Sequence, residues 1–280
     1  MRRTTPIGKA VWFIESRFAQ AISLDDIARS AGVSRYQLSR TFSFATGRSV
    51  IAYLRGRRLS EAARALAKGA PDILSVAIEA GYGSHEAFTR AFRDQFGLTP
   101  EQLRAQRHLD NIQLVEPVKM DEELFDHLEP PRFEDGRPLL IAGLSERYDC
   151  ESSRAIPAQW QRFGPHFGHV PGQVGDTAYG VCCNSDEAGN FDYLCGVEVS
   201  DFTELPANFA RLRVPAQRYA VFFHRDHIST IRRTFSTIFN KWLPESGYEA
   251  ADAPEFERYG KEFDPVTGLG GLEVWVPLKS

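Results

Sequence analysis

Residues 27–47 read IARSAGVSRYQLSRTFSFATG, and residues 76–97 read VAIEAGYGSHEAFTRAFRDQFG. Each stretch contains an Ala-Gly pair, a Ser, an Arg-x-Phe triplet and a closing Gly, in the same order and with almost the same spacing. A helix, a glycine-containing turn and a serine-capped second helix are the parts of a helix-turn-helix. The repeat therefore predicts two helix-turn-helix motifs, and with them DNA binding.

The sequence around the repeat predicts an all-α N-terminal domain over residues 1–108. Its two helix-turn-helix motifs are joined by one long helix, and a last short helix begins at Thr99-Pro100, where Thr is a good cap and Pro fits the first turn. At 20 residues the joining helix would be ~30 Å long, close to the ~34 Å between successive major-groove faces. The predicted helices cover residues 7–20, 24–31, 34–45, 49–68, 73–80 and 84–96.

The second helix of each motif has one apolar face and one polar face. Leu38 with Phe42, and Phe88 with Phe92 and Phe96, are spaced four residues apart and should face the core. Arg40 and Arg90 occupy the same position in the repeat, and arginine can bond two acceptors of guanine, so both are predicted to read bases. The full set predicted to contact DNA is Arg35, Tyr36, Ser39, Arg40, His85, Glu86, Thr89, Arg90 and Arg93.

Some of these positions allow two interpretations. Glu86 can stabilise the helix through its dipole or accept a hydrogen bond from cytosine. Tyr36 can contact DNA or pack locally. Arginines other than Arg40 and Arg90 are expected to contact phosphate rather than bases, which adds affinity but little sequence information. These are Arg35, Arg48, Arg55, Arg57, Arg58 and Arg93.

Charge divides the chain at about residue 108. The first 108 residues carry a net charge of +8, and the remaining residues carry −12. A basic part followed by an acidic part is typical of a nucleic-acid binder joined to a second domain. Four cysteines, no membrane-length apolar run and no signal-peptide pattern predict a cytoplasmic protein with no membrane partner.

The second part is predicted to be an α+β domain over residues 139–280, after a linker and first-strand region over residues 109–138. The stretch LEPPRFEDGRP, residues 128–138, is rich in Pro and charge. Strand-like runs and two helical segments then alternate, which favours an α+β fold. The strands are expected at residues 139–148, 177–183, 191–199, 209–214, 219–224 and 272–278, and the helices at 157–167 and 228–243.

Residues 7–107 resemble the AraC/XylS family of transcription regulators. The resemblance rests on SLDDIARSAGVSRYQLSRTF, YLRGRRLSEAARAL and IEAGYGSHEAFTRAFRDQFGLTPEQLR. It implies binding to double-stranded promoter DNA, with RNA polymerase as a further expected partner, and leaves the promoter open.

Residues 112–280 resemble a GyrI-like effector-binding domain, and the order of the two domains is that of Rob-like regulators. The residues that carry this are RLRVPAQRYAVFFHRDH, FNKWLP, EFERYGKEFDP and GLEVWVPL. The resemblance implies a pocket for a small, lipophilic or cationic effector. It also implies that Glu273, in the last strand, is the pocket carboxylate.

The residues of that strand support the same assignment. Glu273 alternates with Trp275 on one face, and a carboxylate buried beside aromatic rings needs a positive partner, which suits a cation. Glu273 could instead be a solvated strand residue, and the aromatic residues could be ordinary core. Glu257 and Glu198 are weaker candidates. The predicted effector site is Trp160, Phe163, Tyr179, Tyr193, Tyr259, Glu273 and Trp275.

The main hypothesis is therefore a ligand-responsive, sequence-specific transcription regulator that is not an enzyme. We expect no metal and no cofactor, because His166/His169 and His224/His227 lack a helical setting for both pairs and no nucleotide-binding motif has its proper context. Two alternatives stay open. The second domain could hydrolyse a small ligand, with Glu273 as base and a tyrosine assisting, or it could act as a ligand sponge.

Overall fold

The computed structural model describes residues 5–118, 128–149, 152–186 and 189–279, without the side chain of Tyr36. It divides into two compact units. The first unit contains Met1–Arg35 and Arg48–Met120, and the second contains Tyr36–Gly47 and Asp121–Ser280. The second helix of the first helix-turn-helix motif is thus grouped with the C-terminal residues.

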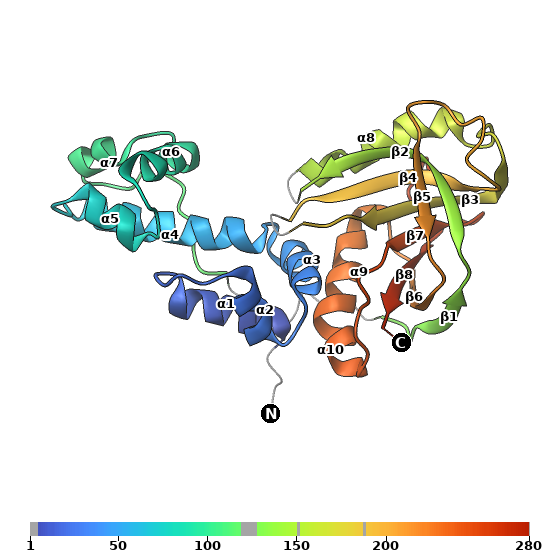
Figure 1. The fold of residues 1–280 in the computed structure, drawn as a ribbon, viewed down its shortest axis with the longest axis horizontal. Coiled ribbons are helices and arrows are strands. Elements are labelled where there is room, and N and C mark those ends of the chain that lie inside the picture. The colour runs from blue at the N-terminus through green and yellow to red at the C-terminus, as the bar shows by residue number, and fades with distance from the viewer. Residues whose placement is uncertain (1–4, 119–127, 150–151, 187–188, 280) are drawn as a thin grey trace. The chain divides into compact units, whose positions relative to one another are not determined.

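The first unit is helical, as predicted (Figure 1). Side-chain caps fix several helix starts: Ser49, Ser84 and Thr99 each accept a hydrogen bond from a backbone N–H in the first turn. Gly32 and Gly97 end their helices in the left-handed conformation that glycine adopts most easily. The helices are α1 (Pro6–Arg17), α2 (Leu24–Ala31), α4 (Val50–Ala67), α5 (Ile73–Glu79), α6 (His85–Phe96) and α7 (Pro100–Gln106).

The second motif packs around the C-terminal part of α4. Phe88, Phe92 and Phe96 form the buried stripe of α6 that their spacing predicts, and they share a core with Leu59 and Leu66 of α4. The apolar face of α6 is therefore fixed against this core, and its other face remains available to a partner.

The second unit combines α3 with eight strands and several short helices. Strands β2, β4 and β8 have the predicted bounds, and β1 lies within the predicted first-strand region of residues 109–138, whereas β7 was not predicted. The helical elements are α3 (Arg35–Thr46), η2 (Ser152–Ala155), α8 (Ile156–Phe163), η3 (Gly164–His166), η4 (Ile228–Thr230), α9 (Ile231–Thr237), η5 (Ile238–Trp242) and α10 (Leu243–Ser246). The strands are β1 (Arg132–Gly136), β2 (Leu139–Tyr148), β3 (Gln173–Cys183), β4 (Phe191–Val199), β5 (Ala210–Val214), β6 (Gln217–His224), β7 (Glu255–Tyr259) and β8 (Leu272–Leu278).

The eight strands form one antiparallel sheet with the order β1-β6-β8-β7-β3-β4-β2-β5. The strand β7 lies at its middle, between β8 and β3 (Figure 1). Its sequence, EFERY, contains three charged and two aromatic residues and lacks the apolar run that marks a buried strand. This composition is why β7 was not predicted, although it carries the cavity-lining residues Glu257 and Tyr259.

Alternation along the strands sends side chains to two faces. Phe235 and Phe239 of the α9–η5 segment pack on Phe222, Val274 and Val276, which defines the helix-covered face. The α8 residue Phe163 packs on the same side of other strands, with Tyr193 and Cys195. A separate cluster from β2 to β7 fills the opposite face. Because successive side chains of a strand point to opposite faces of the sheet, consecutive residues within β7, and within β8, lie on different faces.

Candidate functional site

The DNA-facing residues predicted on α6 lie opposite its phenylalanine stripe. Glu86, Arg90 and Arg93 are exposed, as base or phosphate contact requires. His85 is half-buried, and its Nε2 lies 3.0 Å from Glu101 Oε1 of α7. The Thr89 hydroxyl is buried without a hydrogen-bond partner among the described residues. Base contact by these residues stays a prediction, and Arg90 has the most open position for it.

The residues predicted on α3 are placed differently. Arg35 is exposed and pairs with Asp25, whereas Ser39 and Arg40 are buried in this structure. The expectation that Ser39 and Arg40 face outward is therefore wrong for this conformation. The side chain of Tyr36 lies outside the described residues. Arg40 is buried because it pairs with Glu255 of β7 within the second unit.

Two arginines of α4 that were expected to contact phosphate are instead structural. Arg57 is 4% exposed and donates to both carboxylate oxygens of Glu15, at 3.0 Å for each of its closest bonds, and to the backbone carbonyl of Val115. Arg58 donates to the carbonyls of Phe18 and Gln20. The phosphate prediction is wrong for Arg57, because its guanidinium is fully engaged inside the first unit.

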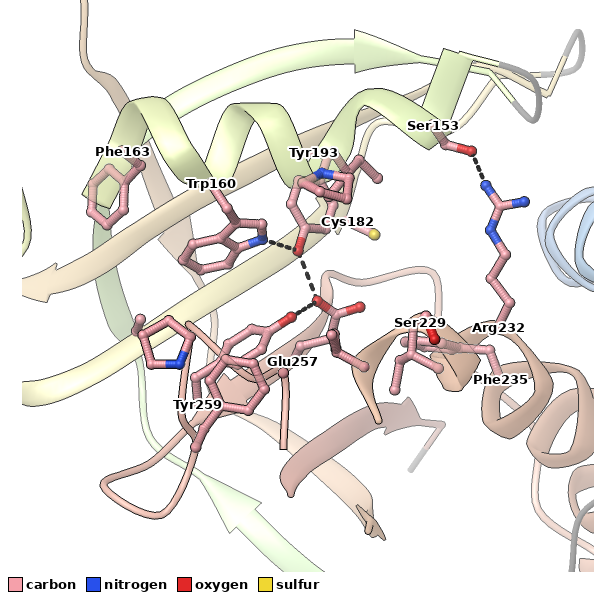
Figure 2. A pocket seen from close by; sticks show the side chains of 18 of the residues that line it. Ser153, Trp160, Phe163, Cys182, Tyr193, Ser229, Arg232, Phe235, Glu257 and Tyr259 are labelled. Carbon is pink, nitrogen blue, oxygen red and sulfur yellow. Dashed lines mark hydrogen bonds between the residues drawn. The ribbon is translucent and has the colours of Figure 1, made fainter. Parts of the chain in front are cut away.

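The second unit contains a cavity of about 1380 Å³ on the helix-covered face of the sheet. Residues from α3, α8, β3, β4, β7, α9 and the segment after β7 line it. Four predicted effector-site residues belong to this lining: Trp160, Phe163, Tyr193 and Tyr259. Of these, Trp160, Tyr193 and Tyr259 lie near Glu257, a carboxylate that also lines the cavity (Figure 2).

A hydrogen-bonded chain holds Glu257 in place. Tyr193 and Tyr259 each donate a hydroxyl hydrogen bond to Glu257 Oε2, both at 2.7 Å. Trp160 Nε1 in turn donates to the Tyr193 hydroxyl at 3.0 Å (Figure 2). Among the described residues, Glu257 Oε1 has no hydrogen-bond partner. The arrangement fixes the carboxylate and leaves one oxygen for a ligand.

A glycine makes this close approach possible. Gly180 of β3 pairs with Glu257 in the sheet register. A Cβ at that position would lie 2.1 Å from the Tyr193 hydroxyl and 2.6 Å from Glu257 Oε2. Since no real Cβ tolerates such distances, any side chain at position 180 would displace the tyrosine or the carboxylate.

The electrostatics of Glu257 follow from its burial. Burial raises the pKa of its carboxyl group, and the hydrogen bonds from Tyr259 and Tyr193 and the charge of Arg40 oppose that rise. Burial also raises the pKa of both tyrosine hydroxyls well above the ordinary value, so they stay protonated donors. The carboxylate therefore lacks full compensation in the cavity, and a bound positive charge would stabilise its ionised form.

The other three predicted effector-site residues do not line the cavity in the described part of the chain. Glu273 and Trp275 pair in register with Arg258 and Phe256, which places them on the face opposite Glu257, and Tyr179 is opposite Arg258 in the β3–β7 register. The alternation of β8 explains this, because its apolar residues Leu272, Val274 and Val276 take the helix-covered face.

The chain itself supplies the positive partner that Glu273 needs. Arg132 donates to Glu273 Oε1 at 2.7 Å, and Arg258 and Trp275 Nε1 donate to Oε2 at 3.3 and 2.9 Å. Despite burial, these bonds and charges hold the pKa of Glu273 below its usual value. Glu273 therefore has the positive partner that a buried carboxylate needs, but that partner is internal to the chain. Of the weaker candidates, Glu198 pairs with Arg137, whereas Glu257 lines the cavity.

Comparison with known proteins agrees with this architecture. Residues 129–279 match the family described as GyrI-like small molecule binding domain, more than half of the chain. The chain belongs to the GyrI-like family. Residues 27–106 match a helix-turn-helix domain, so the GyrI-like domain follows an AraC-type DNA-binding region, as the sequence predicts. The protein is a DNA-binding transcription regulator with a small-molecule binding domain.

One relative matches the chain over almost its whole length, and others match over about half of it. The chain is 26% identical to the transcriptional regulator Rob of Salmonella typhimurium, over 92% of this chain and 91% of that protein. It is 31% identical to the transcriptional regulator BrlR of Pseudomonas aeruginosa, over 51% of this chain and 53% of that protein. A solved structure of SAV2435 bound to tetraphenylphosphonium aligns with 54% of this chain and 95% of its own, at 18% identity and a TM-score of 0.46.

No helix in the described part of the chain is both long and apolar enough to cross a membrane.

Proposed function

We propose that the GyrI-like domain of this regulator binds a lipophilic cation, and that Glu257 is the group that meets its charge. The observation that carries the proposal is a buried carboxylate with one unpaired oxygen, held by two tyrosine hydroxyls inside a large aromatic cavity. A cation in such a site gains both ionic and cation–π attraction, worth about 2 kcal/mol or more for the latter when water is excluded.

The other charges around the cavity do not oppose this assignment. Arg154, Arg232 and Lys261 line the cavity but are exposed to solvent, where water and salt screen them. Arg40 is the buried exception, and its charge is paired with Glu255. Deep in the cavity the local balance therefore favours a positive ligand that can displace water from the aromatic rings.

Calorimetric titration with tetraphenylphosphonium tests the proposal, because this ion has a fixed positive charge and no acidic proton. Tetraphenylborate has nearly the same shape with the opposite charge and serves as the ligand control. We expect the phosphonium to bind and the borate not to bind. Glu257→Gln should abolish this preference, whereas Glu273→Gln, a matched change on the opposite face, should keep it. Equal binding of the two ions would refute the role of Glu257.

The DNA-binding face of α6, with Arg90 for base contact and Arg93 for phosphate, completes the proposed regulator. Purified protein mixed with sheared genomic DNA at physiological salt should retain one enriched motif. A promoter carrying that motif, transcribed in vitro, then tests the proposed contact with RNA polymerase. Unchanged mass of the effector after incubation would oppose the hydrolase alternative, and effector binding without a change in transcription would favour the sponge.

A further inference from the structure

The effector cavity is lined in part by a helix that belongs to the DNA-reading repeat. Ser39, Arg40, Ser43 and Phe44 of α3 line it together with residues of α8, β7 and α9. The Phe44 ring stacks on Phe235 of α9, with centroids 5.2 Å apart. The face of α3 that the sequence assigns to DNA is therefore the face that closes part of the cavity.

Arg40 is bound there as a cation. Its Nη2 pairs with Glu255 Oε1 of β7, and both side chains are almost completely buried. Its guanidinium carbon lies 5.0 Å from the ring centroids of Phe44 and of Phe191. A carboxylate and two aromatic rings around a positive charge are the same elements that the cavity offers to an external cation.

The two carboxylates of β7 share one environment. Glu255 and Glu257 are two residues apart on the strand, so both face the helix-covered side. The charge of Arg40 also reaches Glu257 and Cys182, where it opposes the rise in pKa that burial causes. A second positive charge in the cavity would therefore compete electrostatically with Arg40 for the same acidic centre.

The bond between Arg40 and Glu255 is incomplete. Arg40 Nε and Glu255 Oε2 are buried and have no hydrogen-bond partner among the described residues. A buried ion pair must offset the loss of water around both charges, and it does so well only when the remaining polar atoms are also bonded. This pair is consequently one that a ligand with better complementarity can displace.

We propose that Arg40 is an internal occupant of the effector cavity, which a cationic effector displaces so that α3 becomes free to bind DNA. This inference rests on the proposed function, because it assumes that the cavity accepts a cation. It adds the means of regulation: Arg40 cannot bond Glu255 and a guanine at once, so the closed conformation withholds a base-reading residue. The effector shifts the population by binding the open conformation more tightly.

The first test measures DNA binding by the full chain without effector, on the duplex enriched from genomic DNA. Glu255→Gln removes the charge that holds Arg40 and keeps the size of the side chain. If the closed conformation is favoured by about tenfold, this variant should bind the duplex about tenfold more tightly than wild type. It should also no longer respond to tetraphenylphosphonium. Wild-type DNA affinity in a Glu255→Gln variant that melts as wild type does would overturn the proposal.

The second test measures cation binding without DNA. Arg40→Met removes the internal competitor, so the affinity for tetraphenylphosphonium should rise several-fold, whereas Arg90→Met should leave it unchanged. A decrease or no change in Arg40→Met would contradict the proposal. Hydrogen exchange adds a readout that needs no variant: the amides of α3 should lose protection when the phosphonium binds.

The two proposals fail in different ways. If wild type does not bind tetraphenylphosphonium, the proposed function fails, yet Glu255→Gln still reports whether Glu255 restrains α3. If the phosphonium binds through Glu257 but Glu255→Gln leaves DNA affinity and its phosphonium response unchanged, the cation site stands and the displacement of Arg40 is refuted.

Discussion

Tyr193 donates its hydroxyl hydrogen to Glu257 across 2.7 Å, and Trp160 donates to the same hydroxyl from the other side. One tyrosine thus joins α8 to the carboxylate of β7. Because the bond goes to the charged form of Glu257, it favours ionisation against the effect of burial. The tyrosine is therefore a positioning residue for the charge that the effector meets.

Tyr193→Phe should weaken binding of tetraphenylphosphonium at neutral pH by about 10-fold, which is the scale of one hydrogen bond to a charged group. The loss raises the pKa of Glu257 further, so the affinity should recover when the pH is raised. Titration calorimetry of wild type and variant at several pH values measures this. A deficit that is the same at every pH would indicate lost packing rather than a change in Glu257 ionisation.

Cation affinity should rise with pH. The pKa of Glu257 is raised, so the empty cavity holds a proton up to a higher pH than an ordinary glutamate does, and a cation must displace that proton. Affinity should increase as the pH passes upward through this pKa, and binding should release protons. Calorimetry in buffers of different ionisation enthalpy counts them. Glu257→Gln should bind weakly and show no such dependence.

The same shift affects stability, with a sign that can be worked out. A group whose pKa is raised by folding stabilises the folded state below its unfolded pKa, and this contribution is lost as the pH rises through the folded pKa. Comparing the free energies of unfolding of wild type and Glu257→Gln along the pH scale should show the wild type losing stability relative to the variant as Glu257 ionises. A difference that does not vary with pH would contradict the raised pKa.

Arg90 and Arg93 should differ in what they do on DNA. Arg90→Ala should cost about 1–3 kcal/mol on the enriched duplex and relax the preference at one base. Arg93→Ala should weaken binding to all duplexes similarly and reduce the salt dependence by about one phosphate contact. Binding isotherms at several salt concentrations separate the two effects. Equal losses on specific and unrelated duplexes for Arg90→Ala would remove its base-reading role.

Arg57 should matter for stability rather than for DNA. Arg57→Met leaves Glu15 without its bidentate partner and removes the bond to Val115, and breaking a buried pair costs about 3–5 kcal/mol. Tyr53 still donates to Glu15, so the lower end is expected. Urea unfolding measures the loss, with the exposed Arg55→Met as the control on the same helix. A salt dependence of DNA binding that falls only in Arg57→Met would reverse this assignment.

Elements whose structure depends on a local pattern could be predicted from the sequence. The spacing of Phe88, Phe92 and Phe96 defined the buried face of α6, and the ends of β2, β4 and β8 followed from continuous apolar alternation. Side chains whose role depends on partners distant in sequence could not be predicted in this way. Arg57 lies in a basic segment typical of phosphate contacts, but its guanidinium binds Glu15, which lies 42 residues away in the sequence.

The exchange of roles between two glutamates has a related cause. Alternation in the last strand correctly predicts that Glu273 and Trp275 share one face of the sheet. Alternation alone does not say which face borders the cavity. That choice was made by the packing of Val274 and Val276 under α9 and η5. Glu257 was considered only as a weaker candidate, because the charged sequence EFERY concealed a central strand. A strand prediction there would have placed Glu257 and Tyr259 together.

Glu273→Gln therefore provides a direct test of the choice between the two faces. If the cation site is at Glu257, the change should leave tetraphenylphosphonium affinity within about twofold of wild type. It should lower stability instead, because Arg132 and Arg258 lose the charge that they share; exposed pairs contribute about 0.2–1 kcal/mol each. Since the pKa of Glu273 is lowered, the stability difference between wild type and variant should vanish as the pH falls through that pKa. Loss of phosphonium binding in this variant, with Glu257→Gln unaffected, would return the effector to the face that the sequence alone favoured.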